Sequence, residues 1–383
     1  MKTLIKYLTI IILNLSLIYQ NALPSDNIKI GLIVPLSGEY SKIGDSIIKS
    51  VRLAINKIDD ERIIIIPKDT KSNPIDALRV SKKLYDDGVR IVIGPVFNEN
   101  TKYLDELKDI TFLSFTNKII KNPTNVISAG VNAISQINTI KKFININNLE
   151  RSIFLIPRTD YKKEIELAIN KTNIKLKDKF VYDKDPMLLT KQIEKLTWYS
   201  LRKQNLKDEI ERLENSSISD KEKKIENLKK KDTLGGINFD SVIIADFDES
   251  LKSVATSLLY TDVSSKRITY ITLNQWFDKS LLKETSLQPL YFPSINKENY
   301  NEFIDDYLNH YNSNPNQLSF LSYDLIGLIY FLLYENNFKV SKNIFYKKNK
   351  FKGKIGIFEI NKNIITHQLN FYNVENNKFR KIF

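Results

Sequence analysis

The sequence contains no cysteine among its 383 residues. Disulfide bonds, thiolate metal sites, cysteine nucleophiles and lipid attachment through an N-terminal cysteine are therefore all excluded. Histidine is nearly as scarce, because His310 and His367 are the only two. A zinc site or a nucleophile–histidine relay has almost no residues from which to form.

Other chemical motifs are also missing. No strand is followed by a glycine-rich phosphate-binding pattern, and Gly235-Gly236 is interpreted as a turn. The carboxylates Asp246, Asp248 and Glu249 have no histidine nearby to complete a metal site. We therefore expect no catalytic residues, no metal and no cofactor, and the protein is predicted not to be an enzyme.

The N-terminal segment 1–22 has the three-part plan of a secretory signal peptide. Lys2 and Lys6 precede an apolar stretch at residues 7–19, and a small residue, Ala22, follows. An uncleaved anchor is the weaker alternative, because a spanning helix needs roughly 20 apolar residues. We expect no membrane span after Ala22. The protein is predicted to be periplasmic, and not a lipoprotein because it has no cysteine.

The formal net charge is +13, with lysine spread over the whole chain beside asparagine and isoleucine. A nucleic-acid-binding protein would gather these charges on one face, with aromatic residues between them. No such clustering is present, so nucleic-acid binding is not expected.

Residues 28–34 form an apolar run that ends at Pro35, and an amphipathic segment begins at Ser41. This pattern is typical of a buried parallel strand followed by a turn and a helix. Alternating strands and helices continue to about residue 147, and then the pattern restarts. The predicted elements of this kind include helices at 98–107, 134–143 and 188–201.

We therefore predict an α/β fold with two doubly wound parallel-sheet lobes and a cleft between them. The late helices and strands are expected to complete both lobes, which makes the domains discontinuous. The predicted boundaries are residues 1–22 for the signal peptide, 27–147 plus 291–352 for lobe one, and 148–290 plus 353–383 for lobe two.

Residues 204–232 differ from the rest of the chain because they are dense in charges of both signs. Two short apolar seams run through them, and Ser219 and Glu222 have the spacing of a capping box. We predict a helical hairpin inserted in lobe two. It is interpreted either as a solvated spacer or as a docking arm that offers its apolar seams to a partner.

The runs IKIGLIVPLSGEYSKIGDSIIKSVRLAI, KKLYDDGVRIVIGPV and TFLSFTN resemble the opening of type I periplasmic binding proteins of the leucine-binding kind. A later run, KKKDTLGGINFDSVIIADFDESLKSVATSLLYTDVSSKRITYITLNQWFDKSLLKETSLQPLYFPS, resembles the periplasmic penicillin-binding-protein activators. The resemblance covers residues 27–380. It implies a bilobed fold with a ligand cleft and, for the activators, contact with a penicillin-binding protein.

The strand ends and loops that would border this cleft carry polar and aromatic side chains. In amino-acid-binding relatives the loop after strand three is rich in serine, whereas here it contains Glu99, whose charge would repel a ligand carboxylate. The predicted cleft residues are Ser37, Tyr40, Asn98, Glu99, Ser114, Thr116, Asn117, Asp160, Tyr161, Asp246 and Trp276.

Three functions remain open at this point. The first is regulation of peptidoglycan synthesis by contact with a penicillin-binding protein or another envelope protein. The second is solute binding for an ABC importer of amino acids or another small polar ligand, held in the inter-lobe cleft. The third and weakest is a purely structural role in the envelope.

Overall fold

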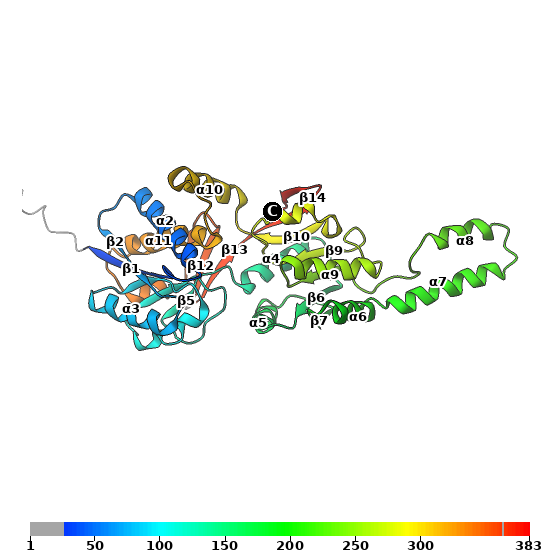
Figure 1. The fold of residues 1–383 in the computed structure, drawn as a ribbon, viewed down its shortest axis with the longest axis horizontal. Coiled ribbons are helices and arrows are strands. Elements are labelled where there is room, and N and C mark those ends of the chain that lie inside the picture. Colours follow the sequence, from blue (N-terminus) through cyan, green and yellow to red (C-terminus); the bar gives the residue numbers. More distant parts are fainter. Residues whose placement is uncertain (1–26, 362–363) are drawn as a thin grey trace, which may run out of the picture.

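The computed structural model describes residues 27–361 and 364–383, and these residues fold into two α/β lobes with a projecting hairpin (Figure 1). The predicted fold class is confirmed. The predicted signal peptide at residues 1–22 lies outside the described residues.

Lobe one is built on an eight-stranded sheet in the described part of the chain, with the order β11-β12-β13-β5-β4-β3-β1-β2. The strands from β2 to β13 run parallel, and β12 and β11 are added antiparallel at one edge. The core strand β1 is almost wholly apolar because both of its faces are covered. The strands are β1 (Ile28–Val34), β2 (Ile63–Asp69), β3 (Ile91–Ile93), β4 (Thr111–Ser114), β5 (Val126–Ser128), β11 (Asn349–Lys352), β12 (Ile357–Asn361) and β13 (Ile364–Gln368).

Among the residues that the structure describes, lobe two is built on a seven-stranded sheet with the order β15-β14-β10-β9-β8-β6-β7. Five strands are parallel, and β14 and β15 pair antiparallel at the edge. The strands are β6 (Ser152–Pro157), β7 (Asp178–Tyr182), β8 (Ser241–Ile244), β9 (Thr269–Thr272), β10 (Leu290–Ser294), β14 (Asn370–Glu375) and β15 (Lys378–Lys381).

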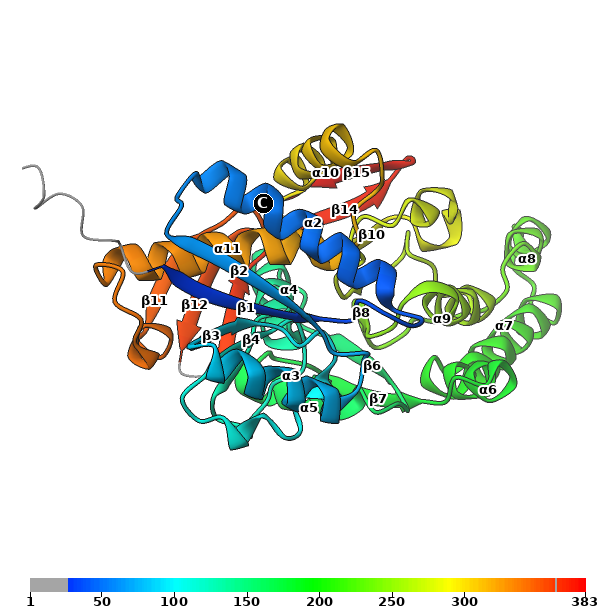
Figure 2. The ribbon, with the colours of Figure 1, turned by 60° about the vertical axis from the view of Figure 1, so that its left-hand side comes forward.

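Helices cover both sheets (Figure 2). In lobe one, α2 packs directly on α11, although one helix lies near the start of the chain and the other near its end. The helices are α2 (Ser41–Ile58), α3 (Pro74–Asp86), α4 (Ala133–Ile146), α5 (Lys162–Thr172), α6 (Pro186–Leu196), α7 (Tyr199–Glu214), α8 (Lys221–Lys229), α9 (Asp248–Tyr260), α10 (Lys297–Tyr311) and α11 (Gln317–Glu335). Short 3₁₀ segments are η1 (Asn98–Thr101), η2 (Leu104–Glu106), η3 (Lys279–Lys283), η4 (Thr285–Leu287) and η5 (Lys342–Phe345).

Within the described residues the chain crosses between the lobes three times. It leaves the first sheet after β5 and enters the second core with α4, whose apolar residues pack with those of β6 and α5. It returns between β10 and α10, and it crosses again between β13 and β14. Both lobes are therefore discontinuous in sequence.

The strand pairing differs in detail from the predicted domain boundaries. Strands β12 and β13 belong to the first sheet, although residues 353–368 were predicted in lobe two. Strand β10 belongs to the second sheet, although residues 291–294 were predicted in lobe one. Helix α4 packs in the second core, although residues 133–146 were predicted in lobe one. Strand spacing alone does not reveal which of two similar sheets a late strand joins.

Two predicted helices also differ from the structure. Residues 98–107 form two 3₁₀ segments, η1 and η2, and not one helix. The predicted helix at 188–201 is divided into α6 and α7 at Thr197 and Trp198, where Trp198 has the left-handed conformation with φ of 52°. This break turns the chain out of lobe two and starts the hairpin.

The arm, defined here as residues 199–232, is the predicted helical hairpin of α7 and α8 (Figure 1). Its two apolar seams face each other, and Leu206, Leu213 and Leu228 form a small buried core. The hairpin itself covers these three leucines, whereas Ile218 of the second seam is 40% exposed, so a contact between the seams and a partner stays a prediction. The capping box is not observed either, since α8 begins at Lys221 without a side-chain cap.

Arg202 fixes the base of the arm. It is only 3% exposed, and its guanidinium donates to the carbonyl of Thr197 at 2.9 Å, the hydroxyl of Thr233 at 2.9 Å and the carbonyl of Thr261 at 2.5 Å. The backbone of Leu234 also donates to the carbonyl of Arg202 at 3.0 Å. Both ends of the hairpin are thereby joined to the end of α9, so the arm has a fixed root.

Helix α11 is long and apolar enough to cross a membrane by length and composition, contrary to our expectation that no such segment follows Ala22. Eleven of its residues are buried, among them Leu325, Leu328 and Leu332. The hydroxyl of Ser50 on α2 donates to the carbonyl of Ser319 at 2.5 Å. The apolar surface of α11 is therefore used in the core of lobe one.

Two buried titratable side chains lie in the C-terminal part of lobe one. Burial raises the pKa of Asp324 to about 6, although its carboxylate accepts hydrogen bonds from the backbone of Ile355 and Lys354. Burial lowers the pKa of His367 to about 3, and neither ring nitrogen has a hydrogen-bond partner among the described residues.

These two groups should act oppositely on stability as the pH falls. Below pH 6.5 the unfolded chain protonates His367 more readily than the folded chain, so folding is destabilised by up to about 1.4 kcal/mol per pH unit. Between pH 6 and 3.8 the folded chain protonates Asp324 more readily, so folding is stabilised with a similar slope. We expect the two contributions largely to cancel between pH 6 and 4.

Single substitutions should separate the contributions. Relative to the unmodified protein, Asp324→Asn should lose stability more steeply from pH 6 to 4, and His367→Leu should lose it less steeply. Urea unfolding midpoints at pH 7, 6, 5 and 4 measure these slopes. Slopes of both variants parallel to that of the unmodified protein would contradict the assignment.

Candidate functional site

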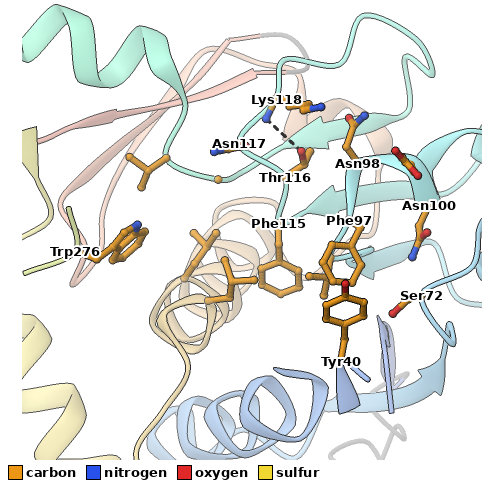
Figure 3. A pocket seen from close by; sticks show the side chains of 16 residues that line it. Tyr40, Ser72, Phe97, Asn98, Asn100, Phe115, Thr116, Asn117, Lys118 and Trp276 are labelled. Atoms are coloured by element: carbon orange, nitrogen blue, oxygen red, sulfur yellow. Dashed lines mark hydrogen bonds between the residues drawn. The ribbon is translucent and has the colours of Figure 1, made fainter. Parts of the chain in front are cut away.

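The cavity bordered by Tyr40 and Trp276, which we call the main cavity, lies between the lobes and has a volume of about 560 Å³; a neighbouring cavity of about 770 Å³ shares Asn98, Glu99 and Lys118 with it. Lobe one contributes the segments that follow β1, β2, β3 and β4, together with the start of α11. Lobe two contributes Trp276, which follows β9. The site is thus at the carboxyl ends of parallel strands, as expected for open α/β sheets. The lining residues are Tyr40, Ser72, Val96, Phe97, Asn98, Glu99, Asn100, Phe115, Thr116, Asn117, Lys118, Gly130, Val131, Trp276, Leu318 and Leu321 (Figure 3).

A second cavity of about 460 Å³ adjoins the first and shares Asn117, Val131 and Trp276 with it. Its other residues are mainly polar and come mostly from lobe two. They are Gln136, Tyr161, Phe247, Asp248, Asn274, Gln275, Asp278 and Gln317. The two cavities form one inter-lobe cleft with an apolar side and a polar side.

Aromatic rings form much of the apolar side. Tyr40 and Phe97 meet edge to face at 4.8 Å between ring centroids, and Phe115 lies beside them (Figure 3). Trp276 stands at the opposite side of the cleft in this view. Such walls favour a ligand with a substantial apolar or aromatic part.

The backbone that presents Trp276 is strained. Trp276 and Phe277 both have the left-handed conformation, with φ of 48° and 58°. For bulky residues this conformation is a genuine outlier that persists only where the surroundings fix it. Asn274 supplies part of that fixation, because its side-chain oxygen accepts from the backbone of Trp276 at 3.0 Å and from the hydroxyl of Ser294 at 2.8 Å.

Seven of the predicted cleft residues are brought together in the cleft. In the main cavity these are Tyr40, Asn98, Glu99, Thr116, Asn117 and Trp276, and Tyr161 lines the second cavity. Whether each contacts a ligand stays a prediction.

The other four residues lie outside the cavity walls. Asp160 is exposed. The hydroxyl of Ser37 donates to the carboxylate of Asp69 at 2.6 Å, and that of Ser114 is buried and donates to the carbonyl of Pro95 at 2.8 Å. Both serines therefore support the loops that border the cleft.

The side chain of Asp246 is also engaged in hydrogen bonds within lobe two. Its side chain is only 4% exposed and accepts hydrogen bonds from the hydroxyl of Tyr182 at 2.7 Å and the amine of Lys184 at 2.9 Å. The backbone of Phe247 donates to it at 3.1 Å. A carboxylate satisfied by three donors in this way has little capacity left for a ligand.

Several residues that line the cleft were not predicted from the sequence. Leu318 and Leu321 come from α11, far along the chain from Tyr40, and only the packing of α11 on α2 brings them to the cavity. Phe97 and Asn100 belong to the loop after β3, in which we had singled out only the neighbouring polar residues. The apolar character of the site was therefore missed.

Few charges line the cleft. Glu99 and Lys118 border the main cavity, while Asp248 and Asp278 border the second. Asp278 is engaged, since its carboxylate accepts from the backbone and hydroxyl of Ser280 at 2.9 and 2.7 Å. In the part of the chain that the structure describes, no group of three or more His, Cys, Asp or Glu side chains is placed to hold a metal ion.

Comparison with known proteins relates the chain to periplasmic binding proteins. Residues 27–162 match the family model described as periplasmic binding protein. The Leu/Ile/Val-binding protein BraC3 of Rhizobium johnstonii is 30% identical over 76 residues, which are 18% of this chain and 21% of that protein. The matched segment thus spans about a fifth of that relative.

Solved structures extend the likeness over both lobes. A protein assigned to a branched-chain amino acid ABC transporter of Rhodospirillum rubrum superposes with a TM-score of 0.69 at 12% identity, covering 93% of this chain and 100% of that one. The C-domain of LpoA (YraM) from Haemophilus influenzae, a regulator of PBP1A, superposes with a TM-score of 0.62 at 13% identity and the same coverage.

These findings define a two-lobed binding-protein fold. The chain has the fold of the type I periplasmic-binding-protein superfamily, and its resemblance to that superfamily is confirmed. Its neighbours in fold include both an amino acid transport protein and a regulator of a penicillin-binding protein.

A substitution at Gly130 tests whether the neighbouring wall of the cleft is rigid. A Cβ atom at this position would lie 2.6 and 2.7 Å from the carbonyl oxygens of Phe115 and Thr116, which belong to the cleft wall. Gly130→Ala should therefore displace that wall and destabilise the fold by about 1–3 kcal/mol in urea unfolding.

Gly236→Ala is the matched control, because a Cβ atom there meets nothing within 4 Å. We expect it to change the unfolding free energy by less than about 0.5 kcal/mol. Equal stability of the two variants would show that the wall at Gly130 is not rigid.

Proposed function

We propose that this protein is a non-enzymatic, extracytoplasmic binding protein that closes its lobes on a small ligand, as the solute-binding component of an importer. The observation that carries the proposal is the inter-lobe cavity of about 560 Å³, lined from both lobes. Its volume lies in the usual range for small-molecule sites. The periplasmic-binding-protein match supports the location and the absence of enzymatic activity.

The three crossings of the chain support a closing motion. They are the covalent connections between the lobes, and bending at a few such segments moves one lobe against the other. Trp276 from lobe two faces Phe115, Phe97 and Tyr40 from lobe one (Figure 3). A ligand between them would join the lobes and favour the closed state.

Ligand binding should appear as a thermal stabilisation. A ligand at 100 times its dissociation constant stabilises the folded state by about 2.7 kcal/mol, which raises the melting temperature by several degrees. The panel should include amino acids, small carboxylic acids, amides and other metabolites. If no member shifts the melting temperature, transport is the wrong function.

The two tryptophans of the sequence provide the variants for this test. Trp276→Ala should remove the thermal shift, because it removes the cleft wall supplied by lobe two. Trp198→Phe should keep it, because Trp198 lies at the base of the arm. The Trp198→Phe protein also leaves Trp276 as its single tryptophan, so its fluorescence reports ligand binding directly.

A second candidate function rests on the arm. We propose that it contacts a penicillin-binding protein or another envelope protein and so regulates peptidoglycan synthesis. The supporting observation is its fixed root, where buried Arg202 joins both ends of the hairpin to lobe two. The arm projects away from lobe one and from the cleft (Figure 1), so ligand binding does not use it.

Removal of the arm tests this second function separately. The backbones of Arg202 and Leu234 are hydrogen bonded, so a short Gly-Ser linker can replace residues 204–232 without moving the lobe. The shortened protein should bind a purified penicillin-binding protein at least tenfold more weakly and should keep its ligand-induced thermal shift. Unchanged affinity for the penicillin-binding protein would exclude the arm as the contact.

A further inference from the structure

Two buried polar atoms in the main cavity have no hydrogen-bond partner among the described residues. They are the side-chain nitrogen of Asn100 and the hydroxyl of Ser72. Asn100 is only 2% exposed. Buried polar groups in folded proteins are nearly always paired, so an unpaired set lining a cavity points to a ligand group that pairs with it.

The backbone holds both residues firmly in place. Ser72 follows β2 in the left-handed conformation, with φ of 55°. Asp69 braces this turn, because its carboxylate accepts from the backbones of Leu36 and Lys71, both at 2.8 Å. Asn100 lies in η1, where its backbone donates to the carbonyl of Phe97 at 3.1 Å. The pair is therefore preorganised.

The rings of Tyr40 and Phe97 divide this polar corner from the rest of the cavity. In Figure 3, Ser72 and Asn100 lie on one side of the ring pair, and Phe115 and Trp276 lie on the other. Tyr40 is 39% exposed, so its ring stands at the edge of the cavity and not within the core. A ligand that reaches the polar corner must pass along these rings.

The chemistry of the polar corner favours an uncharged group. Ser72 and Asn100 carry no charge, and the two charged residues that border the same cavity, Glu99 and Lys118, have opposite signs, so the cavity offers no net charge to a carboxylate or an ammonium group. An amide matches both partners, because its carbonyl accepts from the side chain of Asn100 while its N–H donates to the hydroxyl of Ser72. An ammonium group would leave the donor of Asn100 unpaired.

We propose that Ser72 and Asn100 form a subsite for the neutral amide group of a ligand whose aromatic part packs on Tyr40, Phe97 and Phe115. This inference rests on the proposed small-molecule binding and adds the ligand class. It distinguishes aromatic amides from free aliphatic amino acids and from aromatic acids.

Three probes of similar size test the ligand class: phenylacetamide, phenylacetate and leucine. Titration calorimetry with the full chain should give the tightest binding for phenylacetamide, by at least tenfold over the other two. Ser72→Ala and Asn100→Leu should each weaken phenylacetamide about tenfold, which is the usual effect of losing a hydrogen bond to a buried partner. Ser200→Ala, at an exposed position on α7, should leave its affinity unchanged.

A variant that introduces a negative charge protects the test against a variant that fails to fold. Asn100→Asp keeps the side-chain shape and should reverse the preference, so that phenylethylamine binds more tightly than phenylacetamide. Tighter binding of phenylacetate or leucine to the unmodified protein would overturn the amide subsite but leave the proposed function standing. Failure of every compound in the wider ligand panel to bind would overturn both.

Discussion

The contact between α2 and α11 is the constraint on which the rest of the structure depends. Ser46 and Ser319 are joined through their hydroxyls at 2.7 Å, and Tyr307 of α10 also reaches Ser46 at 3.1 Å. Because α2 follows the first strand and α11 comes only after the whole parallel part of lobe two, this packing obliges the chain to leave lobe one and return. The discontinuity of lobe one, the first two crossings and the position of Leu318 in the cleft all follow from it.

The composition of the cleft walls also depends on the return of the chain to lobe one. The strand ends of lobe one supply loops braced by Asp69 and Ser114, and the start of α11 supplies an apolar floor beneath them. Lobe two adds Trp276 on a strained turn held by Asn274. Rigid, partly apolar walls with a few unpaired polar atoms are the usual features of a binding site.

Much of this fold could be predicted because its strands and helices have strong local patterns. The apolar run before Pro35 and the helical spacing after Ser41 depend only on neighbouring residues. Sheet membership of β13 and the inward direction of Phe97 depend on contacts distant in sequence, so local patterns did not reveal them. Asp246 illustrates the same limit, since it looked available at a strand end but is satisfied by Tyr182 and Lys184.

The interpretation of the arm differs most between the sequence and the structure. Its apolar seams first indicated a surface for a partner, yet Leu206, Leu213 and Leu228 cover one another and leave mostly charged outer faces. Exposed ion pairs contribute little affinity, so a partner of the arm would have to recognise its shape and charge pattern. The cleft, in contrast, keeps unpaired buried donors and open aromatic surface. These observations therefore favour the inter-lobe cleft, and not the arm, as the functional site.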